Sequence, residues 1–149
     1  MTSTEFNQLR SRIVREFAAE QVNAGNWHTQ DAEQLAAKEL RRLLPEGLAT
    51  PGMLLLTATI DDTIFGHVWI ATAIPDAPEG EAWIYDIAVK DDLQGRGYGR
   101  QLLRAAERTA KEYGATALGL NVFGTNDVAR SLYESSGYEV KTLQMHKPL

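Results

Sequence analysis

The spacing of apolar residues predicts two helices in the first fifty residues. A first helix is expected at about 4–23, because its apolar residues recur every three or four positions: Phe6, Leu9, Ile13 and Phe17. A second helix is expected to begin after Thr29, a residue type favoured at the N-cap, and to stop at Pro45. Its apolar face consists of Ala36, Leu40, Leu43 and Leu44.

From residue 53 the pattern becomes that of strands. Strands are predicted at 53–60, 64–73 and 82–89, with a turn at 61–63 and a loop at 75–80. A helix at about 97–113, with Leu102, Ala106, Thr109 and Tyr113 on one stripe, is followed by a strand at 118–122, a short helix at 126–135 and a last strand at 138–146. This order predicts an α/β fold with a mixed sheet and helices on both of its faces.

Length and composition indicate one globular domain. The 149 residues, 44% hydrophobic and 23% charged, have no internal repeat or linker, so one domain at 1–149 is expected, with a helical part at 1–50 and a core at 53–147. No apolar run approaches the ~20 residues that span a bilayer, so no membrane partner is expected. The polar N-terminus has no apolar signal core, and we therefore expect a cytoplasmic location.

Residue types narrow the chemistry. The chain has no cysteine, which excludes disulfides and acyl-cysteine intermediates, and its three histidines lack metal-ligand spacing, so no metal is expected. A net charge of −5 argues against a nucleic-acid partner. Eight acids occupy 59–92, whereas five bases and one acid occupy 94–111. This basic stretch is either a solvated helix face or a docking place for a polyanion.

The most informative segment leads from a strand through a glycine-rich turn into a helix. The strand end Ile84-Tyr85-Asp86-Ile87-Ala88-Val89 precedes the turn Gln94-Gly95-Arg96-Gly97-Tyr98-Gly99. Glycines let backbone N–H groups converge, and the free donors of a helix start face the same way, which indicates a phosphate or pyrophosphate site. A turn that serves packing alone remains an alternative. A dinucleotide fold fits less well, because the spacing is GxGxG rather than GxGxxG.

Two motifs resemble the GNAT N-acetyltransferase superfamily. The turn at 94–99 fits that family's Q/R-x-x-G-x-G/A signature, and the segment at 126–138, NDVARSLYESSGY, is similar to its N-x-x-A-x-x-L-Y-E-x-x-G-F/Y signature. The resemblance covers residues 53–147. It implies that acetyl-CoA is the cosubstrate and that the acetyl group passes directly to a primary amine of a small molecule or peptide, within a ternary complex.

The resemblance also implies roles for particular residues. Main-chain groups of Ile87, Ala88 and Val89 would pair with the pantetheine arm like an added strand. The pyrophosphate would be held by the turn, that is by Gln94, Gly95, Arg96, Gly97, Tyr98 and Gly99, with Arg100 adding charge. Asn126 would bond the pantetheine or the helix start, and Tyr133 would protonate the leaving thiolate.

The general base is left open by the sequence. The family often has a Glu where this chain has Trp83 or Asn121, and of these two only Asn121 could orient a water. Asp86 is the remaining carboxylate of the strand, and strict alternation places it on the face of Ile84 and Ala88. Either Asp86 or a water-relayed path accepts the proton, and Asp86 could instead be structural.

Several departures from the family pattern affect the acceptor side. The first strand of the family fold is absent, and the C-terminal strand region is shortened, so we expect exposed sheet edges that a homodimer would cover. Trp27 and His28, between the two N-terminal helices, are either a packing plug or part of the acceptor site. A CoA-binding sensor without catalysis and a nucleotide-binding enzyme are the rival interpretations.

Overall fold

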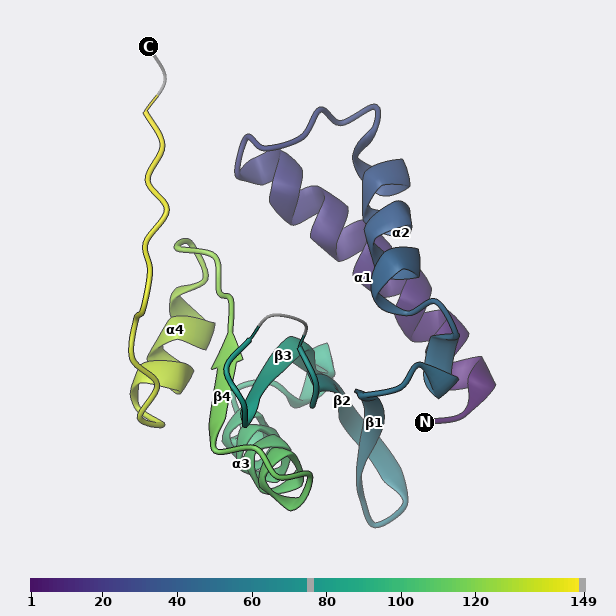
Figure 1. Cartoon of the computed structure of the whole chain (residues 1–149), viewed down its shortest axis with the longest axis vertical. Helices are drawn as coiled ribbons and strands as arrows, with labels where there is room; N and C mark the ends of the chain where they lie inside the picture. Colours follow the sequence, from purple (N-terminus) through teal and green to yellow (C-terminus); the bar gives the residue numbers. More distant parts are fainter. Residues whose placement is uncertain (75–76, 148–149) are drawn as a thin grey trace.

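Four strands form one mixed sheet in the order β1-β2-β3-β4. The computed structural model describes residues 1–74 and 77–147 (Figure 1). Strands β1 and β2 and strands β2 and β3 pair antiparallel, whereas β4 is parallel to β3. The strands are β1 (Met53–Ile60), β2 (Thr63–Ala71), β3 (Glu81–Val89) and β4 (Ala117–Leu120), and the helices are α1 (Ser3–Asn23), α2 (Ala32–Leu43), α3 (Tyr98–Glu112) and α4 (Asp127–Glu134). The predicted mixed sheet is confirmed.

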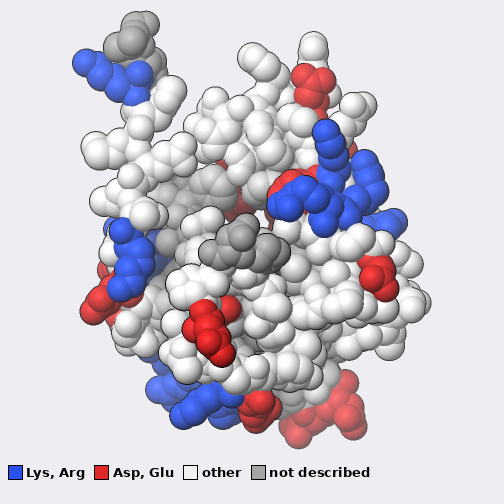
Figure 2. All heavy atoms as spheres, viewed as in Figure 1, with Lys and Arg blue, Asp and Glu red and all other residues white. Residues whose placement is uncertain are grey.

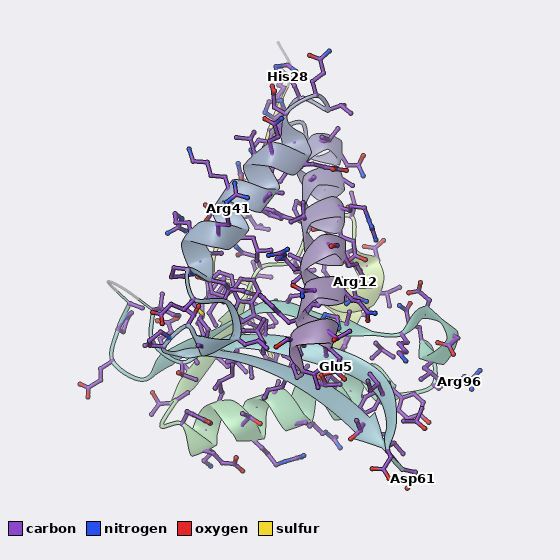
Figure 3. The ribbon with its side chains drawn as sticks, turned by 90° about the vertical axis from the view of Figure 1, so that its right-hand side faces the viewer. Glu5, Arg12, His28, Arg41, Asp61 and Arg96 are labelled. Carbon is purple, nitrogen blue, oxygen red and sulfur yellow. The ribbon has the colours of Figure 1, made fainter. Side chains whose placement is uncertain are left out.

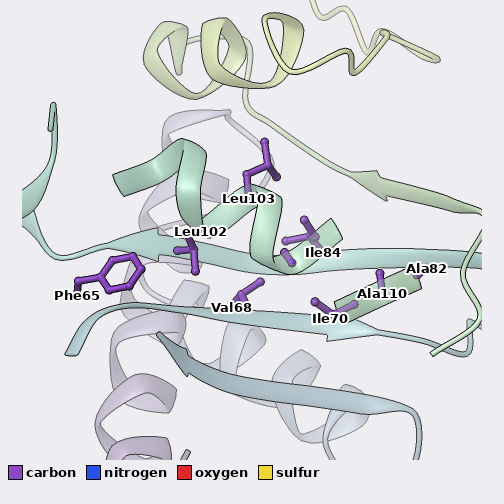
Figure 4. Packing of buried hydrophobic residues seen from close by; sticks show 9 residues of the cluster. Phe65, Val68, Ile70, Ala82, Ile84, Leu102, Leu103 and Ala110 are labelled. Carbon is purple, nitrogen blue, oxygen red and sulfur yellow. The ribbon is translucent and has the colours of Figure 1, made fainter. Parts of the chain in front are cut away.

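Helices cover both faces of this sheet, as the sequence predicts. Helices α1 and α2 lie on one face, where Leu40 and Leu44 pack against Trp69 of β2 (Figure 3). Helix α3 lies on the other face (Figure 4). There, Leu102 and Leu103 belong to one buried cluster with the sheet residues Val68, Ile70 and Ile84. Burial of such aliphatic side chains contributes about 1.5–3 kcal/mol each, so the apolar residues of α2 and α3 hold these helices to the sheet.

The helix ends follow local capping rules, with two corrections. Thr2 caps α1 in a capping box with Glu5. Residues 29–31 form a turn, so the N-cap of α2 is Asp31, and the prediction of Thr29 was wrong. In α3 the buried stripe is Leu102, Leu103, Ala106 and Ala110, whereas Tyr113 lies beyond the helix end and is 61% exposed.

A β-bulge in the centre of the sheet changes which side chains face α1. Trp69 pairs with Asp86, but the next residue, Ile70, pairs with Ile84, so Tyr85 is an extra residue on β3. Ile84 packs into the α3 cluster, whereas Asp86 contacts a side chain on the α1 face. The prediction that Asp86 shares a face with Ile84 was therefore wrong, because strict alternation fails at the bulge.

The predicted last strand at 138–146 is not formed. After α4 the Tyr138 N–H bonds to the Tyr133 carbonyl, and residues 138–147 then continue without strand pairing to any described residue. Figure 1 shows this segment running past α4 and away from the sheet. Within the described residues, α1 is the first element and no strand precedes β1.

In the described residues no helix is both long and apolar enough to cross a bilayer. The same residues contain no cluster of three metal-ligating side chains.

Candidate active site

Strands β3 and β4 diverge part-way along β3. Their pairing runs from Glu81 opposite Ala117 to Ile84 opposite Leu120 and then ends. Strand β3 continues to Val89, while the chain after Leu120 leaves the sheet. The backbone of residues 86–89 therefore has no strand partner on the β4 side within the described chain, which makes it an edge available to an extended ligand.

The turn after β3 presents a row of free backbone donors. The N–H groups of residues 95–100 have no backbone or side-chain acceptor in the described parts of the chain, and the next bond is from the Gln101 N–H to the Gly97 carbonyl, at 3.3 Å. Gly97 is the N-cap of α3 with φ +85°, and Gly95 has φ +72°. A Cβ on either glycine would meet nothing within 4 Å, so the space above the turn is open. The start of an α-helix adds a partial positive charge there, and the turn fits a phosphate group.

The polar side chains of this turn have distinct partners. Gln94 Nε2 donates to the Val89 carbonyl and to Asp91 Oδ1, both at 3.1 Å, and so ties the turn to the end of β3. Arg96 is exposed at the edge of the molecule (Figure 3). Arg100 instead donates to Ser135 Oγ at 2.8 Å and Ser136 Oγ at 3.3 Å. Arg100 therefore connects α3 to the end of α4, and Arg96 is the turn's arginine free of such bonds in the described residues.

Helix α4 begins and ends with residues of the second motif. The Asn126 side chain caps the helix by accepting from the Ala129 N–H at 3.1 Å, which is the helix-start role considered for it. Tyr133 packs against the α3 cluster, and its ring lies 5.8 Å from that of Tyr138. Burial raises the pKa of Tyr133, and the charge of Asp86 adds to this shift. The phenol is therefore protonated at neutral pH, as a proton donor must be.

A hydrogen-bonded chain of three side chains connects β3 to α1. His67 Nε2 lies 2.5 Å from Asp86 Oδ2, and Arg12 Nη2 lies 2.8 Å from the His67 ring nitrogens. His67 is only 7% exposed. Arg12 comes from α1, and Glu16, one turn further along that helix, lies 3.6 Å from Arg12 Nε.

The three groups are chemically complementary. A guanidinium can only donate, and an ionised carboxylate can only accept. The His67 ring lies between them, with Nε2 against Asp86 Oδ2 and both ring nitrogens 2.8 Å from Arg12 Nη2. The other oxygen of Asp86, Oδ1, has no partner in the described residues.

Two further acids of α1 feel the charge of Asp86. Burial raises the pKa of Glu20, and Glu16 and Asp86 add to it. Burial also raises the pKa of Glu16, although the Arg12 charge opposes that shift. The α1 face beside Asp86 therefore carries a local excess of negative charge.

The aromatic residues expected near the acceptor are mostly packed. The Trp27 ring meets the Phe17 ring edge-on at 5.3 Å, which identifies it as a packing residue between α1 and α2, whereas His28 is exposed. Trp69 stacks on Tyr85 at 4.7 Å. Trp83 lies across Gly119 of β4, where an added Cβ would come within 2.5 Å of the indole.

The structure brings together most of the predicted residues, and it adds some. Asp86–Val89, the turn at 94–99 and Tyr133 surround the divergence of the two strands, while Asn121 is exposed just beyond the end of β4. His67 and Arg12 were missed. A single histidine inside the apolar strand β2 was the available signal, but its partners lie 19 and 55 residues away in the sequence.

This geometry agrees with comparisons to known proteins. The sequence profile of the acetyltransferase (GNAT) family matches residues 13–138. This chain belongs to the GNAT acetyltransferase family. It is 36% identical over 150 residues to the uncharacterized N-acetyltransferase YycN of Bacillus subtilis, covering 100% of this chain and 96% of YycN. The crystal structure of YycN superposes with a TM-score of 0.94 at 35% identity, over 100% of this chain and 95% of that one.

More distant relatives share the domain or the fold. The [ribosomal protein bS18]-alanine N-acetyltransferase of Salmonella typhimurium is 36% identical over 89 residues, which cover 60% of this chain and 57% of that enzyme. The fold is also that of AAC(6')-Iy in complex with the bisubstrate analogue CoA-S-monomethyl-acetylneamine, with a TM-score of 0.62 at 15% identity over 100% of this chain and 94% of that one. The chain is accordingly an acyltransferase of the GNAT family, and the resemblance seen in its motifs is confirmed.

Proposed function

We propose that this acyltransferase moves the acetyl group of acetyl-CoA to a primary amine of a small molecule or peptide. The observation that carries the proposal is the divergence of β3 and β4, which leaves one edge of residues 86–89 unpaired beside a turn of free N–H groups. A ligand with an amide-containing arm and a pyrophosphate matches both features. Binding of a dinucleotide, the rival interpretation, would leave the unpaired edge of residues 86–89 without a role.

The cofactor contacts rest mainly on the main chain. Backbone groups of Ile87, Ala88 and Val89 would pair with the pantetheine arm, and the N–H groups of 95–99 would hold the pyrophosphate, with Arg96 close by. Asn121 follows β4 and Asn126 caps α4, and both would contact the cofactor from that side. Arg100 supports the site indirectly, because its bonds to Ser135 and Ser136 keep α3 and α4 together.

Proton transfers at the two ends of the reaction are assigned to Tyr133 and Asp86. Bound acetyl-CoA would supply an activated acyl group as a thioester. The Tyr133 phenol, kept protonated by burial and by the charge of Asp86, donates a proton to the departing thiolate sulfur. The Asp86 Oδ1 oxygen accepts the proton that the acceptor amine loses, directly or through one water.

His67 and Arg12 are positioning residues in this scheme. The His67 ring holds one oxygen of Asp86 at 2.5 Å, and Arg12 contacts the same ring, which favours one orientation of the carboxylate. The acids of α1, Glu16 and Glu20, favour an acceptor that arrives as an ammonium.

An amine panel tests the activity. The enzyme is incubated with acetyl-CoA and with small amines or peptides with a free N-terminus, and both free thiol and acetylated product are measured. We expect thiol release in step with product for at least one amine. Thiol release without any acetylated product from the whole panel would contradict the proposal.

Substitution of the carboxylate tests the proton path. Asp86→Asn should lower kcat about 100-fold while binding of acetyl-CoA, followed by calorimetry, stays unchanged. The exposed acid Asp92 offers a control, since Asp92→Asn removes the same charge outside the bonded chain. His67→Ala should lower kcat and be partly rescued by added imidazole. Unchanged kcat in Asp86→Asn would show that solvent, and not Asp86, accepts the proton that the amine loses.

A further inference from the structure

A pocket of about 440 Å³ lies between helices α1 and α2. Its wall combines aromatic and aliphatic side chains with two cations and one acid: Phe17, Trp27, Leu35, Lys38, Glu39 and Arg42. Leu35 is apolar and yet 39% exposed. Pockets that bind small molecules have this composition, an apolar lining with a few polar groups that fix the orientation of the ligand.

The bulge in β3 turns Tyr85 toward the same side of the sheet as this pocket. In a regular strand, neighbouring side chains point to opposite faces. Here Tyr85 stacks on Trp69 at 4.7 Å, and Trp69 belongs to the cluster beneath α2. The next residue, Asp86, contacts His67 on the α1 face. The bulge therefore places the Tyr85 ring and the Asp86 carboxylate on one face, and bulges that re-aim a side chain in this way are common next to active sites.

On the α2 side, Arg42 connects the pocket to Tyr85. Arg42 donates to the two oxygens of Glu39 at 2.6 and 3.0 Å. Glu39 raises the pKa of Arg42, and the neighbouring phenol of Tyr85 adds to this rise. Lys38 has no ion pair among the described residues. Two cations against one acid give this wall a positive charge, and Figure 2 shows basic side chains gathered over α2.

On the α1 side, the pocket adjoins the acids that surround the proposed base. Phe17, a residue of the pocket wall, directly follows Glu16 and lies three residues before Glu20 on the helix. Burial raises the pKa of both acids, and the charge of Asp86 contributes to each shift. The carboxylates therefore lie in the surroundings of Asp86. The site is acidic on the α1 side and basic on the α2 side.

We propose that the acceptor is a zwitterion, a primary amine joined by an apolar linker to a carboxylate, and that this pocket holds its carboxylate end. The inference rests on the proposed acetyl transfer and specifies its acceptor. The ammonium end lies at Asp86 and the acids of α1, the linker crosses the Tyr85 ring, and the carboxylate meets Lys38 and Arg42. A simple alkylamine leaves these cations without a partner, and a diamine brings a second positive charge against them.

Acceptors of matched length test the zwitterion. The ω-amino acids 4-aminobutanoate, 6-aminohexanoate and 8-aminooctanoate are each compared with the alkylamine and the diamine of the same length, at saturating acetyl-CoA. For the best length, kcat/KM of the amino acid should be about 10-fold higher, mainly through KM, since two exposed ion pairs add up to about 1 kcal/mol each. An alkylamine or diamine that is used equally well would overturn the zwitterion and leave acetyl transfer intact. Acetylation of other amines but of none of these amino acids would overturn it too, whereas failure of every amine would overturn the proposed function itself.

Charge variants test the place of the carboxylate. Lys38→Gln and Arg42→Gln should each raise KM for the preferred amino acid about 5-fold and leave KM for the alkylamine unchanged. Glu39→Gln should lower KM for the amino acid, because it releases Arg42 from its carboxylate partner. Arg41, labelled in Figure 3, lines the neighbouring pocket with Asp31, so Arg41→Gln is a control that removes the same charge and should change neither KM. Equal losses in Arg41→Gln and Arg42→Gln would assign the preference to the overall charge of α2 and overturn the pocket.

Discussion

The proposed reaction needs one side chain that donates a proton and another that accepts one. Tyr133 is in packed surroundings where burial and a nearby negative charge raise its pKa, so the phenol keeps its proton until the thiolate needs it. Asp86 has one oxygen held by His67 and the other without a partner in the described residues. Separate environments for donor and acceptor are typical of acid–base pairs in enzymes.

Tyr133→Phe isolates the donor. The substitution keeps the ring that packs against the α3 cluster and removes only the hydroxyl. We expect kcat to fall at least 10-fold with little change in acetyl-CoA affinity, because the lost interaction belongs to the leaving group. Steady-state kinetics with calorimetry measure both quantities. Unchanged kcat would remove Tyr133 from the mechanism.

Gly97→Val tests the turn. Gly97 has φ +85°, which costs a β-branched residue at least 1–2 kcal/mol, and the added side chain would occupy the open space above the free N–H groups. Loss of acetyl-CoA binding is expected, read as loss of the ligand-induced rise in Tm.

Gly114 supplies a control for backbone strain. It has φ +88° and equally open surroundings, but it follows the C-terminal end of α3. Gly114→Val should lower Tm by a similar amount and still respond to acetyl-CoA. Normal binding by Gly97→Val would place the pyrophosphate elsewhere.

Among the helices and strands, α1 contributes most of the residues around Asp86 that the two sequence motifs do not include. It packs on the sheet through its apolar face and also supplies Arg12, Glu16 and Glu20 to the surroundings of Asp86. Strand β2 is the second contributor, because its bulge-containing register with β3 brings His67 and Asp86 onto the same face.

The raised pKa of Glu20 predicts a pH-dependent stability. An acid whose pKa is raised on folding destabilises the native state when ionised, so stability falls as pH rises from the ordinary value of 4.5 through the raised value. Glu20→Gln should therefore raise Tm at pH 7 and have almost no effect below pH 4.5. Thermal melts from pH 4 to 8 measure this difference. An equal gain at all pH values would point to helix propensity instead of charge.

Across the whole molecule, the sequence predicted what depends on neighbours along the chain. The apolar periodicity located the four α-helices and four strands of the described fold, and the motifs located the turn at 94–99 and Tyr133. Prediction from the sequence failed where a feature depends on residues far away along the chain. The bulge at Tyr85 depends on the register with β2, and the role of His67 depends on α1. Residues 138–146 have the pattern of a strand but no strand partner among the described residues.

Hydrogen exchange measures the proposed role of the divergence between β3 and β4. If acetyl-CoA pairs with residues 86–89, their amides that face away from β2 should exchange more slowly when it is bound. Amides of β1, which lies at the other side of the sheet, should be unaffected. Equal protection of both strands would indicate a general stabilisation rather than an added strand.

The break in pairing after Ile84 and Leu120 also means that mutations affect the two halves of the proposed site differently. Peptide groups line the opening, and every amino acid has them, so most point mutations there leave hydrogen-bonding capacity intact. In the proposed reaction, the acceptor amine instead meets particular side chains of α1, including Glu16 and Glu20. The proposal therefore implies that substitutions in α1 change the choice of amine without changing the binding of acetyl-CoA.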